Sequence, residues 1–427
     1  MRESQGTAYR SNATVMHWKA LLNQAVDHAR QGDLQAALTL LNQVVRLQPE
    51  DGKVYYNRGC VHRDLGQLEA AIADFSTAIY LIPNYGNAYL NRGNVHRQQG
   101  DLGAAIADFD CALQHQPTSA RTYGSRGLVY LEQQQYKRAI ADFTRALQHQ
   151  PKFAKLYLWR GCSYLQQRQF AAAIADFNAA LAQDGALAEA YHSRGLAYAY
   201  LNNYYQAIAD MDKALQHDAY LLEGYANRGM LRYRLGDTEG AIADYQHAIA
   251  LSQDPEFCER PCVASSLGLY RSDEKSEGPT IRMAELYNNR GTLRAELGDT
   301  QGAIADYTAS LRLVPNKAKT YNNRGLAYCH QGDYHPAIRD FNQALSLQPN
   351  YAAAYSNRGS ARSRIGDTVG ALQDFTRALD LDPNLTEAYL SRAQTLAQLH
   401  DTAAALQDYQ RALSLRETRC SRVLVTP

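Results

Sequence analysis

The sequence predicts an all-α protein built as a solenoid of stacked antiparallel helix pairs. Three observations lead to this prediction. Short strings recur at a constant interval, each interval has room for two helices, and turn-forming residues separate those helices. Self-similarity at a fixed period of this size is the signature of repeat architectures, in which each unit packs only on its neighbours.

Two strings define the repeat, namely Ala-Ile-Ala-Asp-aromatic and Asn/Ser-Arg-Gly, and both advance by 34 residues. One step, between the seventh and eighth copies, is 62 residues, which is 34 plus an insertion of 28. Eleven units follow, and their first residues are 18, 52, 86, 120, 154, 188, 222, 284, 318, 352 and 386. Positions within a unit are counted from these residues.

Each unit is predicted to form two helices, A and B. Helix A carries the Asn/Ser-Arg-Gly string and ends near a glycine that can adopt the left-handed conformation, at Gly32, Gly66, Gly100, Gly236, Gly298, Gly332 and Gly366. An aspartate then suits the N-cap of helix B, at Asp33, Asp101, Asp237, Asp299, Asp333, Asp367 and Asp401. Helix B stops before a proline, at Pro49, Pro83, Pro117, Pro151, Pro315, Pro349 and Pro383.

The units predict five segments along the chain. They are an N-terminal extension (1–17), repeats one to seven (18–255), an inserted loop (256–283), repeats eight to eleven (284–419) and a C-terminal tail (420–427). The insertion keeps neither string and is rich in Gly, Pro and Ser, which favours an exposed loop that acts as a hinge, a second contact site or a spectator.

These units resemble the tetratricopeptide repeat family. Its small residue in helix A corresponds to Gly59 and its equivalents, and its small–aromatic–small set in helix B to Ala71, Phe75 and Ala78. Leu41 in repeat one and Ala393 in repeat eleven depart from the pattern. The resemblance implies a right-handed superhelix, with helices A lining a concave side that binds proteins.

Charge and composition exclude several other classes of function. The 44 basic and 43 acidic residues leave a net charge of +1, so no overall field favours nucleic acid. No apolar run is long enough to insert into a membrane. The odd number of cysteines, seven, is simplest in a reduced, cytoplasmic protein.

No candidate catalytic site, cofactor site or metal site emerges, and we expect no enzyme activity. Cys258 and Cys262 in the insertion have no nearby His or Cys pair to complete a zinc shell. His62 and His96 lie 34 residues apart because the repeat copies them, and neighbouring repeats would hold them too far apart to share a metal.

Comparison of the repeats predicts an ion pair between helices A and B. Arg at position seven accompanies Asp at position twenty-three in ten units, for example Arg228 with Asp244. Repeat one has neither, because it has Gln24 and Leu40. Shared ancestry of the repeats is the alternative explanation, since duplication copies whole units.

Position six predicts a ladder of side-chain amides along the groove, because the family pattern points this position toward the concave side. An amide offers both a donor and an acceptor to an extended peptide backbone. The predicted groove residues are Asn57, Asn91, Asn227, Asn289, Asn323 and Asn357, with Trp159 interrupting the ladder and Lys53, Arg121, Lys155, Glu189 and Glu223 flanking it at position two. A solvated polar face inherited by duplication is the alternative.

The predicted function is a scaffold or adaptor that binds an extended peptide or a partner protein in this groove. A substrate-recruiting module for an enzyme on another chain and a self-assembling solenoid are the alternatives. A clamp for the acidic C-terminus of a chaperone is disfavoured, because no unit has Lys or Arg at position six. Repeat one is interpreted as a polar cap, whereas the C-terminal end has no evident cap and could support self-association.

Overall fold

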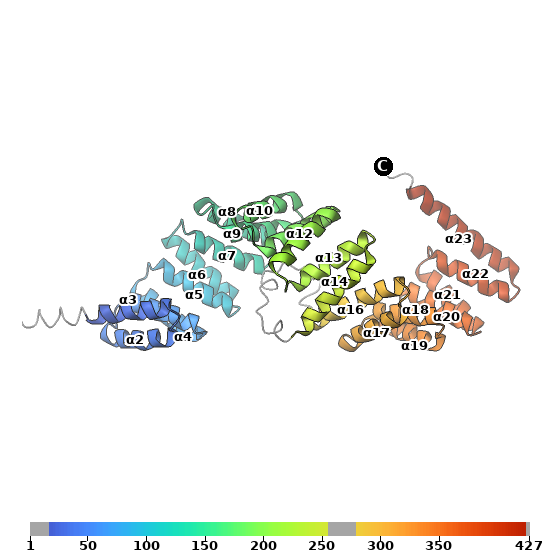
Figure 1. Ribbon diagram of the computed structural model, residues 1–427, viewed down its shortest axis with the longest axis horizontal. Helices are drawn as coiled ribbons and strands as arrows, with labels where there is room; N and C mark the ends of the chain where they lie inside the picture. Colours follow the sequence, from blue (N-terminus) through green and yellow to red (C-terminus); the bar gives the residue numbers. More distant parts are fainter. Residues whose placement is uncertain (1–16, 255–278, 424–427) are drawn as a thin grey trace, which may run out of the picture. The chain divides into compact units, whose positions relative to one another are not determined.

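The computed structural model describes residues 17–254 and 279–423, and their side chains over 17–254 and 280–417. Within these ranges every regular element is a helix, and each of the eleven units contains a helix pair (Figure 1). Helices A span 17–30, α3 Gly52–Asp64, α5 Gly86–Gln98, α7 Ala120–Glu132, α9 Ala154–Gln166, α11 Ala188–Tyr200, α13 Leu222–Arg234, α16 Pro279–Glu296, α18 Ala318–Gln331, α20 Ala352–Arg364 and α22 Thr386–Gln398. Helices B span α2 Leu34–Leu47, α4 Leu68–Leu81, α6 Leu102–His115, α8 Tyr136–His149, α10 Phe170–Gln183, α12 Tyr204–His217, α14 Thr238–Gln253, α17 Thr300–Leu313, α19 Tyr334–Leu347, α21 Thr368–Leu381 and α23 Thr402–Val423.

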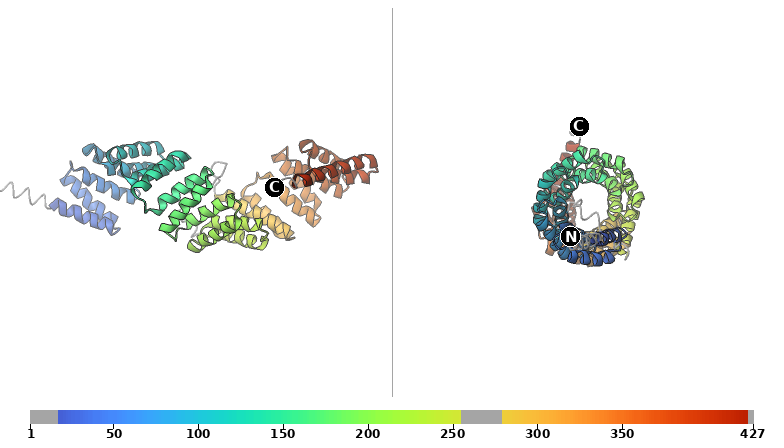
Figure 2. Two further views of the ribbon diagram at one scale, coloured as in Figure 1. Left: turned by 90° about the horizontal axis from the view of Figure 1, so that it is seen from above. Right: turned by 90° about the vertical axis from the view of Figure 1, so that its left-hand side faces the viewer.

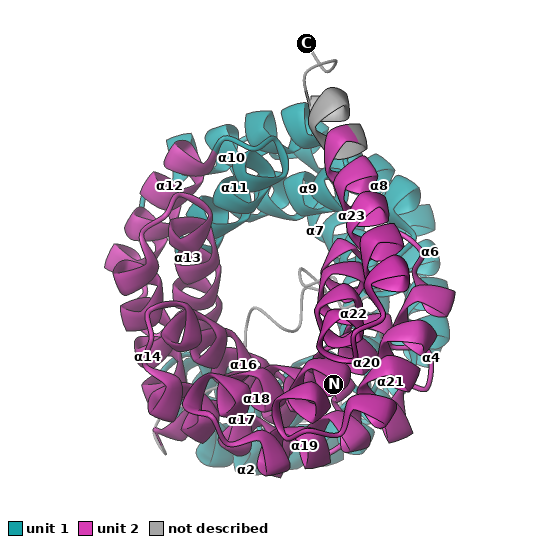
Figure 3. Cartoon of the chain, turned by 90° about the vertical axis from the view of Figure 1, so that its right-hand side faces the viewer, with its two compact units in different colours: residues 1–203, 262–271 teal, residues 204–261, 272–427 magenta. Residues whose placement is uncertain are grey.

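The helices form two compact units, which divide between Asn203 and Tyr204. In the described residues, unit 1 contains the helices up to α11 and unit 2 contains α12 to α23 (Figure 3). Within each unit the helix pairs stack side by side along the chain (Figure 2). The division falls inside repeat six rather than at the insertion, where the sequence suggested a break.

The turn from helix A to helix B follows the predicted chemistry. All seven predicted glycines have positive φ, between 73° and 86°. Six of the seven predicted aspartate caps accept a hydrogen bond from a backbone N–H of the first turn of helix B. Asp333 is the exception, because it sits at the N-cap of α19 without a side-chain cap hydrogen bond.

Repeats seven and eight stack directly despite the insertion between them. Ile249 of α14 shares one buried cluster with Leu286 and Leu293 of α16. The last residues of the predicted insertion, 279–283, are helical because α16 begins at Pro279. The rest of the predicted loop, 256–278, lies outside the described residues, and it includes Cys258 and Cys262. The predicted tail also starts too early, since α23 continues to Val423.

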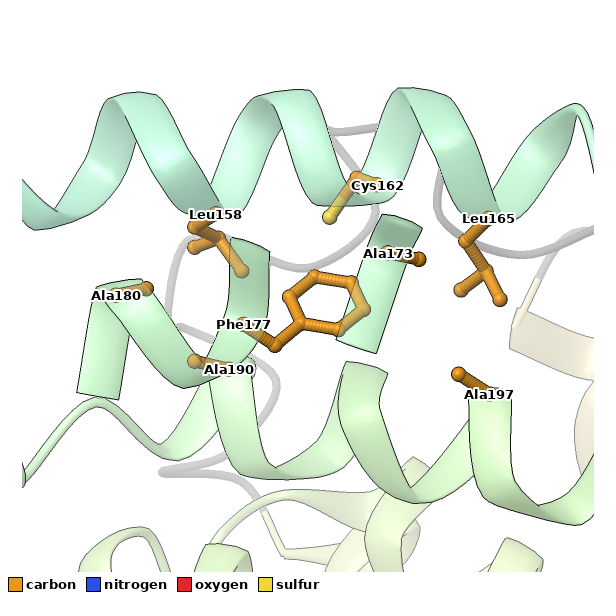
Figure 4. Close-up of a cluster of buried hydrophobic side chains, with 8 residues drawn as sticks. All are labelled: Leu158, Cys162, Leu165, Ala173, Phe177, Ala180, Ala190 and Ala197. Carbon is orange, nitrogen blue, oxygen red and sulfur yellow. The ribbon is translucent and has the colours of Figure 1, made fainter. Parts of the chain in front are cut away.

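In nine of the eleven repeats the core centres on one aromatic side chain inserted between helices, and Leu41 and Met211 take its place in repeats one and six. Phe177 of α10 lies against Leu158 and Cys162 of α9 and against Ala190 and Ala197 of α11 (Figure 4). Its neighbours on α11 are alanines, so three helices approach one ring. The same packing explains the glycine of helix A.

A Cβ atom added at Gly161 would stand 2.7 Å from the ring of Phe177, closer than real side chains approach. The helix propensity lost at this glycine, roughly 1 kcal/mol relative to alanine, is therefore offset by the buried ring. Repeat one has no aromatic ring at this position and needs no glycine. There Ala25 replaces the glycine and Leu41 replaces the aromatic residue, and both are buried.

Helices A lie on the inner side of the stack within each unit. Consecutive helices A contact one another directly, as α5 does with α7 and α20 with α22. Among the described helices, consecutive helices B make far fewer such contacts, so the stack curves with helices A inside. Figure 3 shows α7 and α9 of unit 1 inside α6 and α8.

Four turns lack the glycine and hold a side chain at positive φ, at Gln134, Arg168, Asn202 and His400. We expect Arg168→Gly to raise the free energy of unfolding by about 0.5–1 kcal/mol, because the left-handed conformation is strained for a residue with a Cβ atom. Urea denaturation measures the change. Gly100→Arg, the reverse change at the same position of another repeat, should lower stability, and an equal effect of both substitutions would contradict this explanation.

Candidate functional site on the helix A surface

A buried ion pair fixes helix A against helix B in each of nine repeats. The position-seven arginine donates from Nε and Nη2 to the two carboxylate oxygens of the position-twenty-three aspartate, at 2.7–3.0 Å and 2.5–2.8 Å. These aspartates are only 1–6% exposed. The pairs are Arg58–Asp74, Arg92–Asp108, Arg126–Asp142, Arg160–Asp176, Arg228–Asp244, Arg290–Asp306, Arg324–Asp340, Arg358–Asp374 and Arg392–Asp408. The predicted ion pair is confirmed in these repeats.

The same arginine also reaches the preceding repeat. Its Nη1 donates to the side chain at position twenty-five of the preceding helix B, as Arg160 does to Thr144 at 3.1 Å and Arg358 to Asn342 at 2.6 Å. The acceptors for seven further arginines are Asn42, Ser76, Asp110, Asn178, Asp212, Thr308 and Thr376. One guanidinium therefore connects three helices.

A tyrosine at position four lies beside each of these guanidinium groups. The arginine carbon Cζ stands 5.4–5.7 Å from the ring centre in ten repeats, from Tyr55 to Tyr389. This is the range of a cation–π contact. The planar, rigid guanidinium fork suits this combination of partners.

In three repeats of unit 2 the buried aspartate has a second cation. Position eleven is arginine there, and Arg232 donates to Asp244 at 2.9 Å, as Arg362 does to Asp374. Arg294 makes the equivalent bond to Asp306 at 3.0 Å. Position eleven therefore strengthens the neutralisation of the buried carboxylate in repeats seven, eight and ten.

Several position-six asparagines also form hydrogen bonds between repeats, a role that the sequence pattern does not indicate. Asn91 is only 3% exposed, donates to the Tyr56 hydroxyl at 2.8 Å and accepts from Arg63 at 3.1 Å. Burial raises the pKa of Tyr56 to about 12, so its hydroxyl stays protonated at neutral pH. Asn91 is therefore a structural residue, and the prediction that it lines an accessible groove is wrong.

Repeats eight to ten carry three of these amides on consecutive helices A, and Asn323 and Asn357 are half-buried. Asn289 is exposed, and its hydrogen bond to the buried Tyr245 hydroxyl links it to repeat seven. Asn357 donates to Asn322 at 2.9 Å, and Asn323 to Asn288 at 3.5 Å. Each bond runs to the preceding repeat and uses only part of the hydrogen-bonding capacity of the amide.

The remaining predicted groove residues occupy varied environments. Asn57 and Asn227 are half-buried. Trp159 packs its ring against Phe143 and Phe153, with ring centres 6.0 and 6.4 Å apart. Trp159 thus covers the core aromatic of the preceding repeat while its other side remains partly accessible.

The position-two side chains differ between the two units. Lys53, Arg121 and Lys155 of unit 1 are exposed, whereas Glu189 is half-buried. In unit 2, Glu223 accepts a hydrogen bond from Arg282 at 2.8 Å. Glu223 is therefore engaged by a residue of the predicted insertion and is less available to a ligand than the three basic residues.

The partners at positions four, five and twenty-five were missed from sequence. Tyrosine at position four recurs in ten units and would have stood out in the same internal comparison. Position twenty-five is harder to find, because Asn, Ser, Asp and Thr share only a side-chain acceptor. Position five changes type from Tyr56 to Asn288, so no sequence signal marks it.

Profiles of known families test the repeat pattern directly. Profiles described as tetratricopeptide repeat match residues 22–85, 83–152, 125–190, 188–219, 222–255, 284–317, 318–351 and 386–419. These ranges span well over half of the chain. The chain belongs to the tetratricopeptide repeat family. Repeat ten lies outside the matched ranges and has the same helix pair, α20 and α21, with the same Arg358–Asp374 bond.

Among solved structures, a tetratricopeptide repeat protein from Parabacteroides merdae is similar, with 21% identity, 59% of this chain and 98% of that chain covered, and a TM-score of 0.46. The hetero-tetramer Cut9–Hcn1 of the APC/C has 13% identity, 93% coverage of each chain and a TM-score of 0.44. Yeast Tom70 has 17% identity, coverage of 94% and 92%, and a TM-score of 0.36. The sequence has no significant match among curated proteins.

No helix in residues 17–254 and 279–423 is long and apolar enough to span a bilayer. Among the side chains of residues 17–254 and 280–417, no three or more His, Cys, Asp or Glu gather as a metal would require.

The Arg160–Asp176 pair is the best place to measure the energy of the ion pair. The Arg228–Asp244 pair is less suitable, because each of its two side chains has a further charged partner. We expect Arg160→Met to lower the free energy of unfolding by about 3 kcal/mol, since it leaves Asp176 buried without its partner. The double variant Arg160→Met/Asp176→Leu should lose much less than the sum of the two single variants. Urea denaturation of the four proteins gives the coupling energy, and additive losses would exclude the pairing.

His192, at position five of repeat six, predicts a pH dependence of stability. Burial lowers its pKa from 6.5 to about 4, so the unfolded chain binds its proton at a higher pH than the folded chain does. Stability should therefore fall as the pH drops from about 6.5 to 4, by up to roughly 3 kcal/mol. His192→Leu, which copies Leu158 at the same position of repeat five, should flatten this part of the stability–pH curve. An unchanged slope would show that other groups cause it.

Proposed function

We propose that the chain is a non-catalytic scaffold that binds extended segments of partner proteins along the helix A surface of repeats eight to ten. The observation that carries the proposal is the series Asn289, Asn323 and Asn357, one amide on each of three consecutive helices A. Bonds to the preceding repeat hold these amides in place before any ligand arrives. Such preorganisation lowers the entropic cost of binding.

The spacing of these amides suits an extended peptide. Packed helices lie roughly 8–10 Å apart, and an extended strand advances about 3.3 Å per residue. One amide would therefore meet the peptide backbone about every third residue. Because backbone N–H and C=O groups occur in every sequence, this contact provides affinity with little dependence on sequence.

The charged side chains give the helix A surface of each unit its own selectivity. In unit 1 the exposed Lys53, Arg121 and Lys155 favour an acidic segment. In unit 2, Lys317 pairs with Glu285 at 3.1 Å, so the surface near the amides is closer to neutral. The cysteines at 60, 111, 162 and 329 are free thiols, which supports placing this interaction in a reducing compartment such as the cytoplasm.

The test is affinity capture with the full chain and a triple variant, Asn289→Ala, Asn323→Ala and Asn357→Ala. We expect at least a tenfold loss of captured partner. The matched control replaces three exposed helix B residues of the same repeats, Gln301, Gln343 and Arg377, with alanine and should keep the partner. Thermal melting of each variant separates lost binding from lost folding.

Capture of the same partners at wild-type levels by a folded triple variant would remove the amides from the binding surface. A stoichiometric enzyme among the captured proteins would identify the chain as a recruiting module for that enzyme.

A further inference from the structure

The last helix B exposes two leucines whose counterparts are buried or half-buried in the other repeats. Leu406 at position twenty-one is 58% exposed and Leu413 at position twenty-eight is 59% exposed. Position twenty-eight of the two preceding repeats, Leu345 and Leu379, is 7% exposed in each. All three residues at position twenty-eight are leucine, so the difference in exposure comes from their place in the array.

The next helix A covers these positions inside the array, and in repeats ten and eleven it does so with small side chains. Ala354 at position three of α20 packs in one cluster with Leu345, and Ala388 of α22 with Leu379. Position ten makes the second contact, as Ala361 packs with Phe341 and its neighbour Ile338. Across repeats two to eleven these two positions hold mainly Ala, Val, Thr, Ser, Gly and Leu.

A polar contact lies midway between the two apolar ones. In nine of the covering helices the position-seven arginine donates to position twenty-five of the helix that it covers, as Arg392 does to Thr376 at 3.2 Å. In repeat eleven position twenty-five is Gln410, which is exposed and carries a side-chain acceptor. Leu406, Gln410 and Leu413, here called the terminal face, thus repeat the set of groups that receives a helix A elsewhere.

The first helix of this protein does not match the terminal face. Over 17–30, positions three, seven and ten are Ala20, Gln24 and Asp27. Asp27 is exposed and pairs with Arg30 at 3.5 Å. Stacking this helix on the terminal face of a second copy would bury a carboxylate among leucines and would omit the arginine.

We propose that the terminal face binds an amphipathic helix of another protein, one with two small residues seven apart and an arginine four residues after the first. In sequence terms the helix reads small-x-x-x-Arg-x-x-small. Its small residues cover Leu413 and Leu406, and its arginine donates to Gln410. The surface is separate from the proposed peptide-binding amides of repeats eight to ten, so either can fail without the other.

The test measures binding of a fluorescent, lactam-bridged peptide with the sequence of α20, residues 352–364, to the full chain by fluorescence anisotropy. This peptide carries Ala354, Arg358 and Ala361 at the three contact positions. We expect micromolar binding, at least a tenfold loss with Leu413→Glu, and no loss with Tyr80→Glu. Tyr80 is 83% exposed on α4 and receives the same charge. Because both substituted side chains are exposed, both variants should melt at the wild-type temperature.

A second peptide tests the recognised pattern. Replacing Arg358 with Gln and Ala361 with Asp gives the residues that the first helix has at positions seven and ten, and this peptide should bind at least tenfold more weakly. Absence of binding to the wild-type chain, equal binding to Leu413→Glu, or equal binding of the two peptides would overturn the proposal. It would also be overturned by light scattering that shows a concentration-dependent dimer abolished by Leu413→Glu, because a second copy would then occupy the face.

Discussion

The guanidinium at position seven is the interaction on which the rest of the array depends. It bonds a buried aspartate in its own repeat, a polar side chain in the preceding repeat and the face of a tyrosine on its own helix. A buried ion pair adds little net stability, because desolvation offsets the attraction. Its geometry, however, fixes the rotation of helix A about its axis and its position along that axis relative to two helices B.

That constraint divides each repeat into a fixed part and a free part. The arginine, the aspartate, the glycine and the core aromatic vary little, because they contact one another within a few ångströms. Residues next to them on helix A, such as Trp159 and Asn289, change from repeat to repeat. A rigid frame with variable neighbours suits recognition, since the chemistry of the surface can change without movement of the backbone.

The period of the sequence was sufficient to predict the helix pairs, their turns and the Arg–Asp pair, because each depends on contacts within one repeat or on a feature that recurs. The role of Asn91 was not predictable in this way. Its burial follows from Tyr56 and Arg63 of the preceding repeat, and no other repeat has a tyrosine at the position of Tyr56. The division of the compact units at Asn203 likewise has no local sequence marker, since it falls inside a repeat of normal length. Predictions based on one repeating unit are weakest where a side chain depends on what its neighbour happens to carry.

The packing of α14 on α16 has a consequence for how the chain tolerates change. Ile249 meets Leu286 and Leu293 across a link that is 28 residues longer than at the other junctions. The entropy of closing a loop grows only with the logarithm of its length, so a long link weakens such a contact by a small amount. At this junction the surfaces of α14 and α16 bind each other like two separate molecules joined by a linker. The linker raises their local concentration, whereas the shapes of the two surfaces determine how well they pack. The link can therefore gain, lose or exchange residues over generations, and a cut within it would leave two fragments that still recognise each other.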